Sequence, residues 1–155
     1  MDYVRYIREK VGNIPINLTG TNLIVLNEKE EILLQKRGTF PYKWGLLGGI
    51  VELGESLEEC VIREAKEEAN IEVKNLKLLG TTSGKDCKVT FPNGDETYFI
   101  SIIFYTKDYI GEIKADKKET LELKFFNYNN LPDNIAKTHR EAIEKYFKKQ
   151  RRVTE

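Results

Sequence analysis

The chain has 155 residues, with 25 Lys and Arg residues against 25 Asp and Glu residues, so its net charge at neutral pH is zero. This length suits one domain with a sizeable hydrophobic core, and the balanced charge argues against general attraction to nucleic-acid polymers or membrane surfaces. The sequence shows neither an apolar run of transmembrane length nor a signal-peptide pattern, and its two cysteines do not make a disulfide framework. We therefore expect one domain over residues 1–155, located in the reducing cytoplasm.

A short helix is predicted at the N-terminus. Residues 2–10 carry apolar side chains on one helical face, and Gly12 and Pro15 would end the helix. We treat residues 1–17 as a helical extension that precedes the main body of the domain.

Two strands are predicted next. Residues 18–26 end in a continuous apolar run, which is typical of a buried strand. The polar turn at residues 27–30 leads into a second strand at residues 31–37, and this arrangement predicts a β-hairpin.

The stretch from Gly48 to Ile71 begins with a glycine-rich turn and continues into a helix. Ser56 and Glu59 have the spacing of a capping box, which marks the start of a helix. Apolar side chains then recur at helical spacing at Leu57, Cys60, Val61 and Ala65. Because each residue advances about 100° around a helix, three acids fall within about 100° of arc, and that arc overlaps the apolar stripe. These acids are Glu64, Glu67 and Glu68.

Such an acidic cluster is unfavourable without a positive partner. Like charges three and four residues apart repel each other, and the C-terminal end of a helix dipole disfavours carboxylates. Arg63 is one candidate partner, but we expect it to project from a different side of the helix. Oxygen ligands favour a hard divalent cation such as Mg²⁺. The alternative is a solvated acidic face without a metal.

The residues around this helix match a known pattern. The chain reads Gly49, five residues, Glu55, seven residues, and then Arg63-Glu64-Ala65-Lys66-Glu67-Glu68-Ala69-Asn70-Ile71. This resembles the Nudix box of the Nudix hydrolases at every fixed position except Asn70, where the family has Gly. That position requires a left-handed backbone, which Asn tolerates next best. Leu47 also departs from many members, which carry Pro before the glycines.

The second half of the chain predicts further strands and a final helix. Asn93-Gly94 is a hairpin signal between strands at residues 85–91 and 98–105. Further strands are expected at residues 76–80 and 121–126. A C-terminal amphipathic helix is expected from the stripe Ile135, His139, Ala142, Ile143, Tyr146 and Phe147. We expect residues 98–105 to form a central strand, covered on both faces. The order of elements predicts an α/β fold with a mixed sheet, and the resemblance implies a Nudix-type α/β/α sandwich.

The resemblance also implies Mg²⁺-dependent hydrolysis of a diphosphate joined to another moiety, commonly a nucleoside, with Mn²⁺ as a substitute metal. By position it implies metal ligands at Gly48 (through its carbonyl), Glu64, Glu67 and Glu68, with Glu55 and Glu52 contributing directly or through water. Gly49 and Glu52 would lie against the substrate, and Arg63 would orient the acids. The general base would be a box glutamate or an acid in a late loop, either Glu119 or Glu122, and we favour Glu119.

Several residues have two interpretations. Arg37 ends a predicted strand and either binds substrate phosphates or is solvated. We expect Trp44 to pack beneath the box and His139 to be a packed or surface residue, because no zinc-ligand pattern accompanies it.

The substrate is not selected by any motif in the sequence. Pro92 comes too late for the pattern of the ADP-ribose-cleaving members, so we expect a nucleoside triphosphate or a nucleotide sugar. Base recognition is expected from loops at residues 40–42, 82–86 and 127–132. A nucleotide-sensing module without turnover and a diphosphate-ester isomerase remain as alternatives, and a homodimer is compatible with the sequence.

Overall fold

The computed structural model describes the backbone of residues 2–154 and the side chains of residues 2–152. Its helices are α1 (Tyr3–Val11), α2 (Leu57–Ala69) and α3 (Lys137–Thr154), with short 3-10 turns η1 (Lys85–Cys87) and η2 (Tyr128–Asn130). Its strands are β1 (Ile16–Val25), β2 (Ile32–Arg37), β3 (Trp44–Gly45), β4 (Leu47–Ile50), β5 (Glu72–Lys74), β6 (Lys77–Thr82), β7 (Lys88–Thr90), β8 (Glu96–Thr106), β9 (Asp108–Ile110) and β10 (Thr120–Phe126).

The main sheet is mixed, as predicted. Its order is β4-β1-β8-β6, and β7 also pairs with β8. β1 and β8 run parallel over their full lengths, whereas β4, β6 and β7 pair antiparallel with their neighbours. A smaller sheet has the order β10-β2-β3, and β5 pairs with β9.

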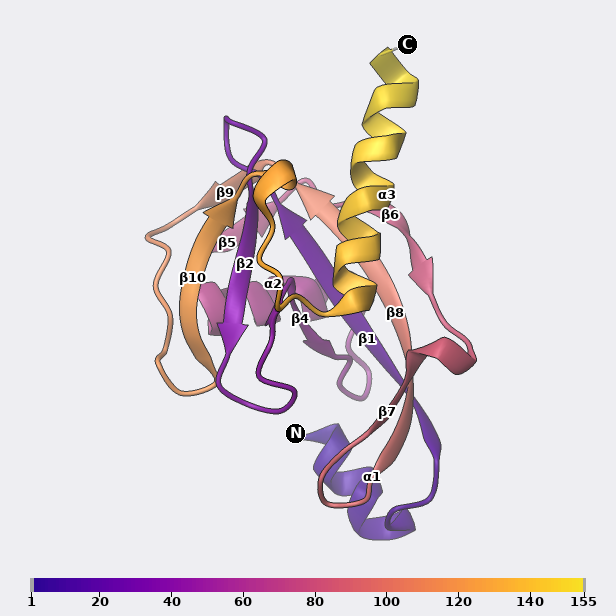
Figure 1. Cartoon of the computed structure of the whole chain (residues 1–155). Coiled ribbons are helices and arrows are strands. Elements are labelled where there is room, and N and C mark those ends of the chain that lie inside the picture. The colour runs from indigo at the N-terminus through magenta and orange to yellow at the C-terminus, as the bar shows by residue number, and fades with distance from the viewer. Residues whose placement is uncertain (1, 155) are drawn as a thin grey trace.

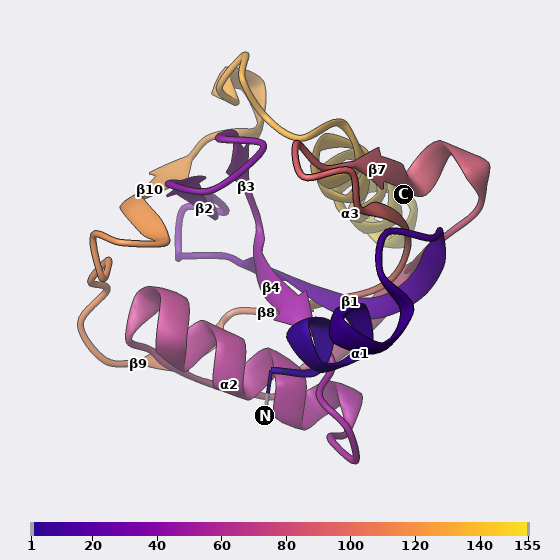
Figure 2. The same ribbon diagram turned by 90° about the horizontal axis from the view of Figure 1, so that it is seen from below.

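The two longer helices cover opposite faces of the main sheet (Figures 1 and 2). Ala142, Ile143 and Tyr146 of α3 pack into one core, and Val61 and Ala65 of α2 pack into the other. Strand β1 supplies alternate residues to both cores, as the two-residue period of a strand requires. The predicted α/β/α sandwich is therefore confirmed.

The predicted hairpin between the first two strands is wrong. β1 and β2 meet only at an isolated bridge between Leu26 and Ile32, and β2 then leaves the main sheet to pair with β10 and β3. The reason is burial on both faces, because Leu34 faces the α3 side and Leu33 the α2 side. A strand with two apolar faces needs cover on both sides, and the space between the two helices provides it.

The predicted central strand lies where expected but is only partly covered. In β8, Ile103 and Phe104 are buried, whereas residues 98–102 are half-buried. The β7–β8 hairpin forms with Gly94 at φ 94° in its turn, as predicted. The half-buried part of β8 lines a cavity that is described below.

The N-terminal helix is confirmed and is tied to the body of the protein by Arg8. The Arg8 guanidinium donates to the carbonyl oxygens of Gly12, Ile14 and Glu96 at 2.7–2.8 Å. At the other end of α1, the Tyr3 N–H donates to a Glu52 carboxylate oxygen at 2.9 Å, so this end reaches the box. Among the described residues, the helices are too short or too polar to cross a membrane.

Candidate active site

Helix α2 begins and ends as its sequence predicts. The Ser56 hydroxyl accepts the N–H of Glu59 at 3.1 Å and caps the first turn. Asn70 ends the helix in the left-handed region at φ 60° and ψ 30°, and its side chain donates to the carbonyl of Glu112 at 3.0 Å. The Asn side chain thus gains a contact that Gly would lack, which limits the cost of the departure from the family pattern.

Arg63 does not project away from the acids, contrary to the expectation from the helical wheel. Its guanidinium makes a bidentate pair with Glu55, at 2.6 and 2.9 Å, and donates to Glu64 at 2.8 Å. It also lies 3.3 Å from a carboxylate oxygen of Glu67. The long side chain reaches back along the helix, so one arginine contacts three carboxylates. The predicted pairing of Arg63 with Glu55 is confirmed.

Glu68 is buried and held by groups from two strands, β2 and β4. The Gly48 N–H donates to one carboxylate oxygen at 2.8 Å. The other oxygen accepts from the Gln35 amide at 2.9 Å and lies 3.5 Å from an Arg37 nitrogen. The predicted phosphate ligand Arg37 therefore lies beside the acidic cluster, on the same face of β2 as Gln35.

Sequence reasoning missed the residues that support Glu68. Gln35 is fully buried, and its amide also donates to the carbonyl of Leu46 at 3.1 Å. Its carbonyl oxygen accepts from the hydroxyl of Thr120 on β10 at 2.7 Å. With donors and acceptors matched at both ends, the amide has one favourable orientation. A polar Gln within an apolar strand was the available signal, but nothing in the sequence identified its partners.

Two glycines before the box helix lie in close contacts. The glycine-rich turn predicted to begin at Gly48 is wrong at this point, because Gly48 and Gly49 lie in strand β4, which pairs antiparallel with β1. A Cβ atom at Gly49 would lie 2.2 Å from a Glu64 carboxylate oxygen, so this strand lies directly against the acid. At Gly48, which has φ 150°, a Cβ would lie 1.9 Å from the backbone oxygen of Thr21. The two glycines therefore let the backbone of β4 approach both the carboxylate and strand β1 closely.

The charges of the cluster are only partly balanced. Hydrogen bonds from Arg63 lower the pKa of Glu55 to about 2, so this acid is ionised. Burial, followed by the charge of Glu64, raises the pKa of Glu68 to about 8, and burial raises the pKa of Glu64. Burial is the main cause of both raised pKa values, so it disfavours the ionised form of these two carboxylates.

This donor set fits a hard divalent cation. A Glu64 carboxylate lies against Gly49 of β4, and a cation would supply the charge that the two arginines leave uncompensated. Within residues 2–152, however, no group of three or more acidic, His or Cys side chains is already gathered around one point. The carboxylates instead point at Arg63, Gln35 and the backbone, so a metal would need side-chain rearrangement.

An acidic cavity of about 400 Å³ lies between α1 and the box. Glu64 and Glu67 line it together with Glu52 and Arg63, and the N-terminal end of α1 closes one side through Asp2 and Val4. The Glu67 side chain is 59% exposed and Glu64 is half-buried. Several predicted site residues therefore share one cavity.

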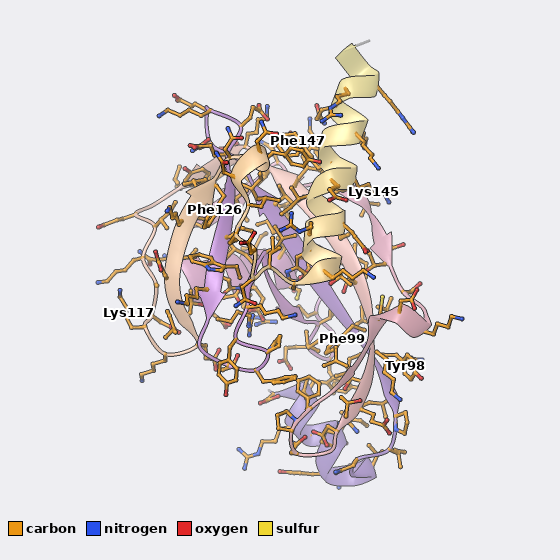
Figure 3. All side chains as sticks on the ribbon, viewed as in Figure 1. Tyr98, Phe99, Lys117, Phe126, Lys145 and Phe147 are labelled. Atoms are coloured by element: carbon orange, nitrogen blue, oxygen red, sulfur yellow. The ribbon has the colours of Figure 1, made fainter. Side chains whose placement is uncertain are left out.

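A second cavity, of about 370 Å³, lies on the other side of strand β4, and we call it the aromatic cavity. Gly48, Gly49 and Ile50 form its border with the box. Its aromatic and charged lining residues are Phe40, Trp44, Phe91, Phe99, Arg37, Lys43, Asp86 and Lys88. Phe99 and its neighbour Tyr98 lie on opposite sides of β8, and Phe99 is on the side of the cavity (Figure 3).

Two of the three loops predicted for base recognition line this second cavity. They contribute Phe40 and Pro41, and Thr82 and Asp86. The third loop instead packs on the core through Tyr128 and Leu131. Trp44 packs edge-to-face on Phe126 in the α3-side core rather than beneath the box, contrary to the prediction, and it also lines the cavity.

The late-loop acids lie apart from both cavities. Glu119 and Glu122 are exposed, and neither lines the cavities of about 400 and 370 Å³. The loop that carries Glu119 also contains Lys117, which lies on the far side of the molecule from α3 (Figure 3). The Gly38 N–H donates to the carbonyl of Glu119 at 2.8 Å, so the loop is attached to the end of β2.

Comparison with known proteins decides the family. A family model described as NUDIX domain matches residues 17–146, which is most of the chain. The chain belongs to the NUDIX family. Helix α1 lies outside the matched residues. The expected enzyme class is confirmed: this is a Nudix hydrolase that cleaves a pyrophosphate bond, and enzymes of this family use divalent metal ions.

Its relatives have several names. The chain is 39% identical over 126 residues to the ADP-ribose pyrophosphatase of Methanocaldococcus jannaschii, covering 80% of this chain and 70% of that protein. It is 30% identical over 116 residues to the NAD-capped RNA hydrolase NudC of Pseudomonas aeruginosa, covering 74% of this chain but only 38% of that protein.

Solved structures confirm the Nudix fold. A MutT NUDIX hydrolase from Burkholderia pseudomallei superposes with a TM-score of 0.73 at 26% identity, covering 84% of this chain and 98% of that chain. A MutT protein from Methanosarcina mazei superposes with a TM-score of 0.74 at 25% identity, covering 86% and 95%.

Proposed function

We propose that this Nudix hydrolase cleaves the diphosphate of a small nucleotide derivative with Mg²⁺ as its metal. The observation that supports this most directly is the position of Gly49 in strand β4. Gly49 lies against Glu64 of the acidic cluster and also borders the aromatic cavity. A diphosphate at Gly49 would place its charge near the acids and metal, and its attached moiety among the aromatic side chains.

We propose that Glu64, Glu67, Glu68 and the Gly48 carbonyl hold the metal, with Glu52 and Glu55 contributing directly or through water. A bound divalent ion neutralises phosphate charge and acidifies an attacking water. The two arginines have different tasks. Arg63 fixes the carboxylates of Glu55 and Glu64, and we propose that Arg37, which lines the aromatic cavity, binds a phosphate oxygen.

The proton of the attacking water needs an acceptor in this proposal. Glu119 is the late-loop candidate, but its exposed position outside both cavities requires loop movement before it reaches a diphosphate at Gly49. Glu64 already lies against Gly49 and lines the acidic cavity, which favours a box glutamate. If a Glu119→Gln variant retains turnover, the proton acceptor is a glutamate of the box and not Glu119.

A panel of candidate substrates tests this proposal. It includes ADP-ribose, because a relative at 39% identity is named ADP-ribose pyrophosphatase. Nucleoside triphosphates and nucleotide sugars complete the panel.

The free cysteines, one buried and one half-buried, agree with a reducing cytoplasm. The cytoplasmic location stays a prediction, as do the single-domain organisation and the homodimer.

Phosphate and product release from this panel, measured with Mg²⁺, with Mn²⁺ and with a chelator, tests the proposal. We expect metal-dependent hydrolysis that falls by several orders of magnitude in Glu67→Gln and Glu68→Gln. Glu58→Gln is the matched control, because Glu58 is an exposed glutamate of the same helix. Nucleotide binding without turnover would instead indicate a sensing module, and an isomeric product with intact diphosphate would indicate an isomerase.

A further inference from the structure

One imidazole in the wall of the aromatic cavity is held in a defined orientation. His139 lies in the first turns of α3, and its Nδ1 accepts the backbone N–H of Leu46 at 2.9 Å. The ring lies directly against Gly45, where a Cβ would come within 2.6 Å of Nδ1. Because Nδ1 is an acceptor, the single proton of the neutral ring is on Nε2.

The Nε2–H group has no hydrogen-bond acceptor among the described residues, and the Nε2 atom is not fully buried. The described part of the chain contains no buried side-chain nitrogen or oxygen that lacks a hydrogen-bond partner. The Nε2 atom must therefore be accessible, and His139 lines the aromatic cavity. The structure thus presents a free hydrogen-bond donor on the α3 side of this cavity.

The ring is also neutral at physiological pH. Burial, assisted by the nearby charge of Arg37, lowers the pKa of His139 to about 4. A neutral donor differs from the cations Arg37 and Lys43 in the same cavity, because it gains no ionic attraction to phosphate. It suits an uncharged acceptor.

The remaining wall of the cavity indicates which part of the ligand carries that acceptor. Phe40 lies 5.5 Å from Phe91, and Phe91 lies 6.3 Å from Phe99, measured between ring centroids. Rings from the loop after β2, the β7–β8 turn and β8 therefore provide apolar surface for a flat heterocycle. A nucleobase combines such a face with uncharged acceptor atoms on its edge.

We propose that His139 is a specificity-determining residue, and that its Nε2–H donates a hydrogen bond to an acceptor atom on the edge of the nucleobase bound in the aromatic cavity. This rests on the proposed function, because the nucleobase is the moiety attached to the diphosphate. His139 then has two roles, which its two ring nitrogens separate: Nδ1 supports the Leu46 backbone and Nε2 contacts the ligand.

Two substitutions separate these roles. The amide oxygen of Asn can replace the Nδ1 acceptor, so His139→Asn keeps the bond from Leu46 and removes the donor at the Nε2 position. The amide nitrogen of Gln can replace Nε2–H, so His139→Gln keeps the donor and loses the acceptor for Leu46. Each variant is compared with the wild type for thermal unfolding, for kcat and KM, and for calorimetric binding of the best nucleotide substrate.

We expect His139→Asn to unfold near the wild-type temperature and to raise KM and the dissociation constant about tenfold, the effect of one hydrogen bond. Its kcat should change less. We expect His139→Gln to unfold at a lower temperature while KM stays within about threefold of the wild type. With a diphosphate ester that lacks a base, His139→Asn should match the wild type.

A folded His139→Asn with unchanged KM and affinity would overturn the proposal, and so would a tenfold rise of KM in folded His139→Gln. If His139→Asn does not fold, His139→Gln still decides between the two outcomes. Failure of the proposed function is distinguishable, because the wild type would then bind nucleotide without hydrolysing any member of the panel.

Discussion

The low pKa of His139 makes the stability of the protein depend on pH in a calculable way. The folded pKa is about 4 and the ordinary value is 6.5, so between these values the unfolded chain binds a proton that the folded chain does not. Acid therefore favours unfolding. The contribution of His139 to stability is complete above pH 6.5, falls as the pH drops towards 4, and changes no further below that.

The magnitude follows from the width of this window. Each pH unit within it changes the free energy of unfolding by about 1.4 kcal/mol. Lowering the pH from 7 to 5 crosses about 1.5 units of the window, so it should cost about 2 kcal/mol. Glu68 acts in the opposite direction, because its raised pKa of about 8 lets the folded chain take up a proton first as the pH falls.

The comparison of wild type with His139→Asn isolates the His139 effect, since Glu68 is common to both proteins. Urea unfolding without divalent metal, at pH 7.5, 6.0 and 5.0, gives the free energy of unfolding of each protein. We expect the difference between the two proteins to move by about 2 kcal/mol in favour of His139→Asn between pH 7.5 and 5.0. A difference that stays constant across this range would refute a neutral His139.

Three further outcomes follow from the contacts of the site. Gly49→Ala should displace the flexible Glu64 carboxylate and reduce turnover at least 100-fold, with little loss of melting temperature. Gly48→Ala should instead unfold at a much lower temperature, because its Cβ would meet the backbone of Thr21. Equal melting temperatures of the two variants would contradict this difference. Thr120→Val should cost about 1–3 kcal/mol in urea unfolding, because it leaves the buried Gln35 oxygen without a donor; an unchanged stability would count against the network. Arg63→Lys should lower kcat, because one ammonium cannot make the bidentate pair with Glu55 and also reach Glu64; wild-type kcat would show that this arginine does not position the acids.

The fold was predictable wherever local patterns and burial agreed. The capping box and apolar spacing located α2, the Asn93-Gly94 turn located the β7–β8 hairpin, and an apolar stripe located α3. The false hairpin between β1 and β2 shows where local patterns fail. A short polar turn predicts that the two strands it joins pair with each other. β2 is instead apolar on both faces and packs between two helices, and the residues next to it in the sequence do not indicate this packing.

The site was predictable as a set of residue types but not as a network. The acids, the glycines and the pairing of Glu55 with Arg63 follow from spacing along one helix and its preceding turn. The partners of Glu68 come from β2 and β4, Gln35 is in turn supported by β10, and Glu52 is reached by α1 from 49 residues away. Such contacts depend on the tertiary fold. The role of His139 was also inaccessible, because its two nitrogens face a backbone amide and a cavity that only the folded chain creates.

The charge of the acidic cluster explains why a divalent metal remains the best-supported cofactor although arginines already contact the acids. Glu55, Glu64, Glu67 and Glu68 are four carboxylates, whereas Arg63 and Arg37 are two guanidinium groups, so the fully ionised set has two excess negative charges. Burial also raises the pKa values of Glu64 and Glu68, which favours protonation of these acids and lowers the excess. A single divalent ion matches the excess, and its binding should therefore release protons near pH 7. Calorimetric titration with Mg²⁺ in buffers of different ionisation enthalpy should detect this release, and the release should be smaller in Glu68→Gln.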